Sequence, residues 1–215
     1  MLKSLHVLLQ YCAPQKTLSR FVGILANCRW VWFKNWAIKR LIRKYHVDKS
    51  EALLENLDDY PTFNSFFTRR LKPELRPIAA GDKTIISPVD GCISQIGKID
   101  GDTIFQAKKF HFSTTSLLGG SIEDAQLFHQ GQFATVYLAP RDYHRVHMPL
   151  TGTLIKSTYI PGQLFSVNQF TTQSVPNLFA RNERLYCLFE TAAGPMAVIL
   201  AGAMLVSSIK TVWAM

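Results

Sequence analysis

The hydrophobic pattern of the first 47 residues is that of amphipathic helices. Pro14 separates a first short helix from a second one, expected at about Thr17 to Cys28, because proline cannot continue a helix. A third helix is predicted from about Arg29 to His46. On a wheel of about 100° per residue, its apolar face consists of Val31, Ala37, Ile38, Leu41, Ile42 and Tyr45.

The opposite face of this third helix combines cationic and aromatic side chains. They are Arg29, Lys39, Arg40, Arg43 and Lys44, with Trp32, Phe33 and Trp36 among them. Indole rings and cationic groups occupy the same depth in the headgroup layer of a membrane. The pattern therefore predicts a membrane-binding surface. The alternatives are a solvated basic face on a helix packed against its own domain, and a nucleic-acid contact. We expect no nucleic acid, since the basic residues form no known reading module.

The charge distribution supports a membrane partner. Residues 1–47 contain nine basic and no acidic residues, whereas the remainder contains fifteen of each, so that the net charge of +9 lies in the N-terminal arm. Each Lys or Arg close to an anionic surface contributes on the order of 1 kcal/mol to binding. We therefore predict an anionic membrane surface as a partner of residues 1–47.

Beyond residue 84, short alternating segments separated by Gly and Pro predict strands. They are expected at Thr84–Ile86, Cys92–Ile96, Thr103–Phe105, Phe133–Tyr137, Thr153–Tyr159, Leu185–Glu190 and Met196–Leu200. Residues 48–80 are rich in turns, with one possible short helix at Asn64–Arg70. The predicted class is α+β, a mostly antiparallel β core preceded by N-terminal amphipathic helices. Residues 1–47 would be the membrane-associating helices and residues 48–215 a β-rich catalytic domain.

Three other features limit the class of protein. Thr191–Ile209 is uncharged and long enough for a membrane span, but Gly194, Pro195 and Gly202 interrupt it, so we expect buried strands. The start of the chain has no small-x-small cleavage site, so we expect no secretory signal. Four cysteines show no CxxC spacing, and we expect reduced, mostly buried thiols: Cys12, Cys28, Cys92 and Cys187.

The densest group of reactive side chains lies in YLAPRDYHRVHMP, residues 137–149. It contains His144 and His147, and imidazole is the side chain that transfers protons most readily near neutral pH. Three residues apart, the two rings can meet in a turn or point apart in a strand. The alternatives are hydrogen-bonded structural histidines and a metal site. No further ligand has suitable spacing, so we expect no metal.

Three further segments are plausible loops when each is taken alone. They are SPVDG at 87–91, PGQLFSVN at 161–168 and NLFARNER at 177–184. In the order PVDG, YLAPRDYHRVHMP, PGQLFSVN and PNLFARNER, however, the segments resemble the bacterial-type phosphatidylserine decarboxylases. The resemblance extends over essentially the whole chain, and the histidine segment is its most specific part.

The resemblance implies a lyase that converts phosphatidylserine to phosphatidylethanolamine and CO2 through a pyruvoyl Schiff base. The pyruvoyl group arises from a Ser in an LGST-type motif. Matching positions imply that Asp90 and His147 activate this Ser, since a carboxylate can orient an imidazole that takes a hydroxyl proton. They also imply that His144 serves the decarboxylation step. Phe165, Ser166 and Asn168 would line the substrate side. A membrane phospholipid substrate implies a peripheral position on the cytoplasmic side of the cell membrane.

The LGST motif is not found among the 215 residues. Leu118–Ser121 (LGGS) is similar, but it precedes the histidine segment, where the family places no cut. We therefore expect a truncated chain that is inactive alone and complete only with a small pyruvoyl-bearing C-terminal chain supplied separately. The alternatives are a non-catalytic peripheral lipid-binding protein and a gene remnant.

Overall fold

The computed structural model describes residues 2–81, 84–108 and 110–214. The chain divides into two compact units. The first unit combines Met1–Arg20, Ile93–Thr135 and Gly152–Met215, and the second combines Phe21–Cys92 and Val136–Thr151. Both units are therefore assembled from segments that lie far apart in the sequence.

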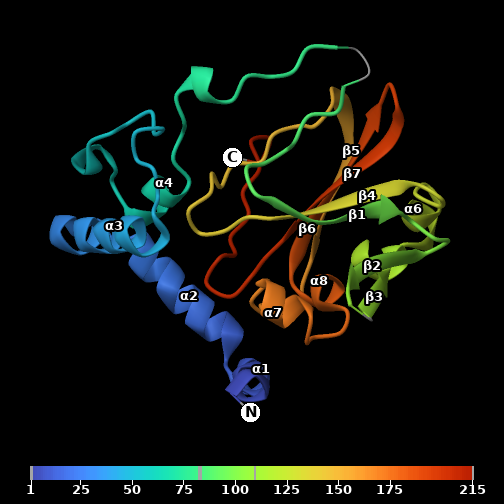
Figure 1. Ribbon diagram of the computed structural model, residues 1–215, viewed down its shortest axis with the longest axis horizontal. Coiled ribbons are helices and arrows are strands. Elements are labelled where there is room, and N and C mark those ends of the chain that lie inside the picture. Colours follow the sequence, from blue (N-terminus) through green and yellow to red (C-terminus); the bar gives the residue numbers. More distant parts are fainter. Residues whose placement is uncertain (1, 82–83, 109, 215) are drawn as a thin grey trace. The chain divides into compact units, whose positions relative to one another are not determined.

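A three-stranded antiparallel sheet forms the centre of the first unit (Figure 1). Strand β6 (Arg184–Thr191) lies between β5 (Gly152–Ile160) and β7 (Gly194–Ala201) and pairs with both. Residues 186–189 of β6 are all buried, and because successive side chains point to opposite faces, both faces of this strand are covered. Gly194 closes the β6–β7 turn with φ of 97°, a conformation that glycine adopts without strain.

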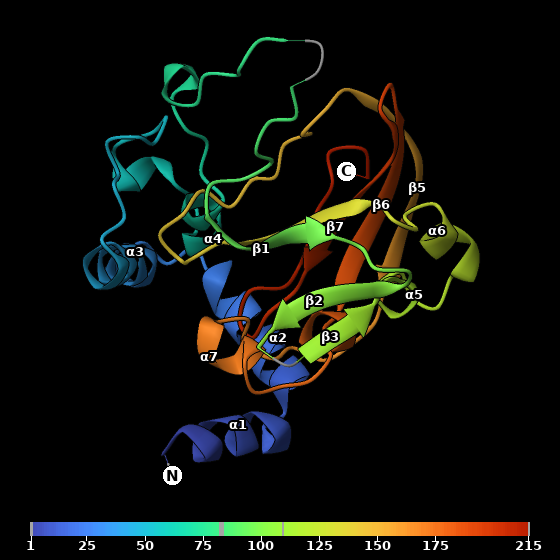
Figure 2. The same cartoon turned by 45° about the vertical axis from the view of Figure 1, so that its right-hand side comes forward.

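The other strands of the structure form two pairs. β2 (Thr103–Ala107) and β3 (Phe110–Ser113) make an antiparallel hairpin (Figure 2), and β1 (Cys92–Lys98) pairs with β4 (Gln132–Tyr137). The helices of the first unit are α1 (Leu2–Cys12), α5 (Thr114–Leu117), α6 (Ile122–Gln126), α7 (Gln169–Thr172) and α8 (Leu178–Arg181). Apolar clusters around Ile104, Tyr186 and Phe165 hold these elements together.

In the second unit, helix α3 (Val31–Tyr45) packs on a short aromatic helix, α4 (Phe63–Phe67). Helix α2 (Gln15–Ala26) precedes α3, and 3-10 turns lie at Leu57–Asp59 and Pro73–Leu75. The core side chains are Ile38, Leu41, Val47, Tyr60 and Phe66. The sequence defines the start of α4, because the hydroxyls of Thr62 and Ser65 each accept a hydrogen bond from the other residue's backbone N–H.

The structure confirms the α+β class and the predicted helices. Six of the seven predicted strands are present, but Thr84–Ile86 was wrong, and β3 was not predicted. The N–H of Ile86 does reach the carbonyl of Pro149, at 3.0 Å. Pro149 has no N–H with which to return a second hydrogen bond to Ile86, and Pro88 has none either, so a ladder cannot extend there.

The segment 191–209 contains the end of β6, all of β7 and an isolated bridge between Ala203 and Val206. Among the described residues, no helix has both the length and the apolar character needed to cross a bilayer. The expectation of mostly buried cysteines was wrong. Only Cys187 is buried, because it lies on the central strand β6, whereas Cys12 and Cys92 are exposed.

Asn182 connects three parts of the first unit and gives a test of the packing. Its side chain is fully buried, accepts from the N–H of Phe165 and donates to the carbonyls of Phe165 and Gly202. The substitution Asn182→Ala leaves these three groups without partners, and should lower the free energy of unfolding by on the order of 3 kcal/mol. Urea denaturation measures this loss. Gln132→Ala, at an exposed position of the same unit, should change stability by less than about 0.5 kcal/mol.

Candidate active site

Two segments that the sequence singled out run side by side in the second unit. The N–H of His147 donates to the carbonyl of Pro88, at 2.8 Å, and this contact places PVDG next to the histidine segment. Gly91 allows a further close approach. A Cβ at this position would lie 2.6 Å from the carbonyl oxygen of Tyr137, so only glycine fits without a shift of the backbone.

Arg76 holds the carboxylate of Asp90. Its Nε lies 2.9 Å and 3.0 Å from the two carboxylate oxygens, and its Nη2 lies 2.6 Å from Oδ2. The same guanidinium contacts Glu51, at 3.0 Å. Asp90, followed by Glu51, therefore raises the pKa of Arg76 above its ordinary value. This ion-pair cluster fixes the position of the Asp90 carboxylate.

The exposed imidazole of His147 contacts Tyr143. Its Nε2 lies 3.1 Å from the Tyr143 hydroxyl, and the two rings stack with centroids 5.6 Å apart. Burial raises the pKa of Tyr143, and the negative charge of Asp90 adds to this effect. Within the described parts of the chain, Asp90 is bonded to Arg76 and not to His147. The relay from Asp90 to His147 therefore stays a prediction.

His144 has a different environment from His147, although only two residues separate them. Its ring lies on Phe67, with centroids 4.0 Å apart, and its Nδ1 is 2.8 Å from the carbonyl oxygen of Asp142. Burial lowers the pKa of His144, because the charged form loses hydration, and the Asp142 carbonyl only partly opposes this effect. The imidazole is therefore neutral at pH 7.

The hydrogen bond at Nδ1 also selects the tautomer of His144. A carbonyl oxygen can only accept, so Nδ1 carries the hydrogen and Nε2 has a lone pair. The carboxylate of Asp142 keeps the carbonyl in place, since it accepts from the N–H of Ala139, at 2.6 Å. The result is an oriented, neutral base, and Nε2 has no hydrogen-bond partner among the described residues.

The three residues predicted on the substrate side belong to the first unit, and their grouping with the histidines stays a prediction. Phe165 is fully buried and meets Tyr11 edge to face, at 4.8 Å. The hydroxyl of Ser166 accepts from Asn168, and Asn168 in turn caps α7 through Thr171. Ser166 and Asn168 thus support the local structure.

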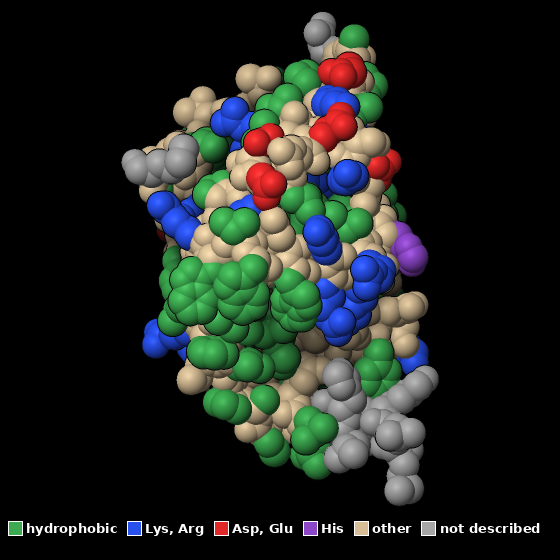
Figure 3. Space-filling model, turned by 90° about the vertical axis from the view of Figure 1, so that its left-hand side faces the viewer, with side chains coloured by type: hydrophobic (Ala, Val, Ile, Leu, Met, Phe, Trp, Pro, Cys, Tyr) green, Lys and Arg blue, Asp and Glu red, His purple; other side chains and the backbone are tan. Residues whose placement is uncertain are grey.

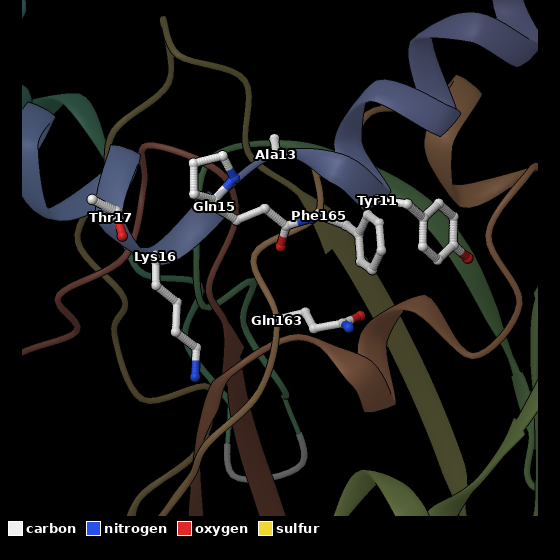
Figure 4. Close-up of a pocket in the computed structure, with 8 residues that line it drawn as sticks. Tyr11, Ala13, Gln15, Lys16, Thr17, Gln163 and Phe165 are labelled. Atoms are coloured by element: carbon white, nitrogen blue, oxygen red, sulfur yellow. The ribbon is translucent and has the colours of Figure 1, made fainter.

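Phe165 also lines a pocket of about 250 Å³. The lining residues come from the turn between α1 and α2 and from the loop that contains Gln163 and Phe165 (Figure 4). Gln15 holds the two parts together, because it accepts from the N–H of Leu164 and donates to the carbonyl of Gln10. This pocket is a structural feature of the first unit that the sequence did not indicate.

Two further possibilities from the sequence were a reactive serine in LGGS and a metal site. The hydroxyl of Ser121, the last residue of LGGS, caps α6 through the N–H of Asp124. No group of three or more His, Cys, Asp or Glu side chains in the described ranges could hold a metal ion. The sequence analysis overlooked Arg76, Tyr143 and Phe67. Tyr143 lies within the histidine segment. Arg76 and Phe67 lie far from it in the sequence, and only folding brings them into contact with Asp90 and His144.

The lowered pKa of His144 predicts a pH-dependent stability. The unfolded chain takes up a proton near the ordinary value of 6.5, and the folded chain does so only at lower pH. The free energy of unfolding should therefore fall as the pH drops below 6.5, and the fall should end once the folded state is also protonated. In His144→Asn, this part of the slope should be missing in urea titrations at pH 5 to 8. His129→Asn, at an exposed position, is the control and should keep the wild-type slope.

Comparison with known proteins identifies the family. A family model described as phosphatidylserine decarboxylase matches residues 63–214, and a second, described as PSD, matches residues 5–46. The phosphatidylserine decarboxylase proenzyme of Ectopseudomonas mendocina is 55% identical over 214 residues, which are 100% of this chain and 75% of that protein.

Two other proteins with the same name show the same level of similarity. That of Bordetella pertussis is 57% identical over 205 residues, covering 95% of this chain and 69% of its own length. That of Pseudomonas aeruginosa is 55% identical over 210 residues, covering 98% and 73%. With a family model over most of its length and relatives this similar, the chain belongs to the phosphatidylserine decarboxylase family.

Proposed function

We propose that this chain contributes the acid–base part of a phosphatidylserine decarboxylase, which forms phosphatidylethanolamine and CO2 in phospholipid biosynthesis. The observation that supports this most is the neutral, oriented imidazole of His144. In the reaction, the α-carbon loses CO2 and takes one proton in its place. A base with a lone pair on Nε2 can take a proton from the substrate ammonium and later deliver it to that carbon.

The family implies a pyruvoyl group, which supplies a carbonyl that withdraws the electron pair left by CO2. The residues around His144 fit such a group, since a half-buried neutral imidazole that lies on an aromatic ring suits proton transfer. The LGST-type serine is not among the 215 residues. We propose that a separate C-terminal segment carries it.

Asp90 and His147 are proposed to activate that serine. The contact of Asp90 with Arg76 is compatible with this role, because each carboxylate oxygen has more than one lone pair and can accept a second hydrogen bond. Arg76 would fix the carboxylate, and the exposed imidazole of His147 would take the hydroxyl proton. Phe165, Ser166 and Asn168 remain proposed substrate contacts.

We further propose that residues 1–47 hold the protein on the cytoplasmic face of the cell membrane, and that residues 48–215 carry the chemistry. Trp30, Trp32 and Trp36 are 66%, 69% and 57% exposed. Figure 3 shows hydrophobic side chains gathered beside Lys and Arg on the face that carries α3. Exposed indoles next to cations match the chemistry of an anionic headgroup layer. A peripheral lipid-binding protein without catalysis is the alternative.

The role of His144 predicts a specific loss of activity. The chain is co-expressed with a C-terminal segment of a relative that contains the LGST motif, and release of CO2 from phosphatidylserine vesicles is measured. We expect activity only with the segment present, and His144→Ala should lower kcat/KM by about 100- to 10,000-fold. His129→Ala is the control. Full activity of His144→Ala would contradict the proposed role.

The membrane proposal predicts binding that depends on both charge and indoles. The chain should float with vesicles that contain anionic lipid, and less so at high salt, because salt screens exposed charges. The double substitution of Trp32 and Trp36 by Ser should lower the partition coefficient about tenfold or more. Trp213→Ser is the matched control, since this indole is also exposed, at 47%, but lies outside residues 1–47. Binding that ignores lipid charge and salt would contradict the proposal.

A further inference from the structure

A second pocket, of about 310 Å³, lies in the second unit and is lined by three arginines, Arg69, Arg70 and Arg145. Arg69 and Arg70 follow Thr68, the residue that caps the end of α4, and Arg145 lies between the two site histidines in the sequence. The only acidic residue of this lining is Asp59. We call it the arginine pocket, and its lining side chains carry a net positive charge.

Arg69 is the buried member of the arginine pocket. It is 3% exposed, and its Nη2 donates to the carbonyl of Arg141, at 3.2 Å. Its Nε and Nη1 are buried and have no hydrogen-bond partner among the described residues. The guanidinium also lies 5.4 Å from the ring of Phe66. Burying a charge without an opposite charge is costly, so an anion in this pocket would offset a cost already present in the fold.

The other two arginines are exposed and extend the same charge to the opening of the pocket. Arg145 is held in position, because its Nε donates to the carbonyl of Thr68, at 2.8 Å. In the described part of the chain, none of the three guanidiniums forms an ion pair within 4.0 Å. Arg76 differs, since it binds two carboxylates. The positive charge of the three guanidiniums is therefore available to bind an anionic ligand.

We propose that the arginine pocket binds a phosphate group, supplied either by the headgroup of a glycerophospholipid or by free phosphate. A phosphate has several oxygens around one centre, so it can accept from more than one guanidinium, whose flat fork of donors fits two oxygens at once. The exposed Leu53 and Leu54 line the same pocket and would contact the carbon atoms of an ester. The headgroup version rests on the proposed function.

The test measures binding of two soluble probes, inorganic phosphate and glycerophosphoserine, to the full chain by calorimetry. Sodium chloride at equal ionic strength gives the baseline. We expect saturable binding of at least one probe. Because Arg69 is buried and its replacement could unfold the protein, the variant is the exposed pair Arg70→Gln and Arg145→Gln. This variant should bind at least about tenfold more weakly, which corresponds to about 1.4 kcal/mol.

The control variant, Lys98→Gln with Lys210→Gln, removes two exposed charges that lie outside the pocket, and it should bind as the wild type does. Tighter binding of the diester assigns the pocket to a lipid headgroup, and tighter binding of inorganic phosphate assigns it to free phosphate. No binding above the chloride baseline, or equal binding by the Arg70 and Arg145 variant, would overturn the proposal. Binding is measured without turnover, so an inactive His144→Ala chain that still binds phosphate would separate this inference from the proposed function.

Discussion

The two adjacent phenylalanines of α4 desolvate His144 and Arg69, the side chains to which we assign proton transfer and phosphate binding in our proposals for the second unit. Phe67 lies on the imidazole of His144, and Phe66 lies near the guanidinium of Arg69. Removal of water disfavours the charged form of both groups, and burial lowers both pKa values. The consequences differ, because an imidazole can release its proton at neutral pH and a guanidinium cannot. One short helix therefore contributes to a neutral base and to a buried cation that forms no ion pair within 4.0 Å among the described residues.

The position of α4 depends in turn on local sequence and on packing. The capping box of Thr62 and Ser65 starts the helix, and Phe66 packs among the core residues of α3 and Tyr60. Phe66 is fully buried, so its ring is fixed by this core. Because Phe67 is the next residue of the same helix, the packing of Phe66 also sets the direction in which the Phe67 side chain points. The environment of His144 is thus coupled to the packing of a helix whose opposite face carries the exposed indoles.

Periodicity predicted the elements of this fold well, because helices and strands are defined by local patterns. The three N-terminal helices and six strands follow from spacing and from Gly and Pro positions. The failures have local causes. The prolines around Thr84–Ile86 stop a ladder, and the four residues of β3 are too few to show a period.

The site was harder to predict than the elements. Asp90 and the histidines were found through the resemblance, whereas the contacts that set their chemistry join residues far apart in the sequence. Arg76 reaches Asp90 across 14 positions, and Phe67 reaches His144 only through the fold. An Arg–Pro sequence and a Phe–Phe pair are common features of turns and cores. Nothing in their spacing distinguishes a residue that binds the Asp90 carboxylate from one that only packs.

The distribution of positive charge in the second unit suits the electrostatics of the proposed reaction. A carboxylate that leaves as uncharged CO2 is best kept away from a guanidinium, because an ion pair would stabilise the reactant more than the transition state. The phosphate of the same substrate keeps its charge throughout, so binding it costs nothing in rate. Arg76 is already occupied by Asp90 and Glu51, the three guanidiniums of the arginine pocket are not, and His144 is neutral. If both proposals hold, the substrate would be bound through the anion that persists, and the anion that is lost would lie beside an uncharged base.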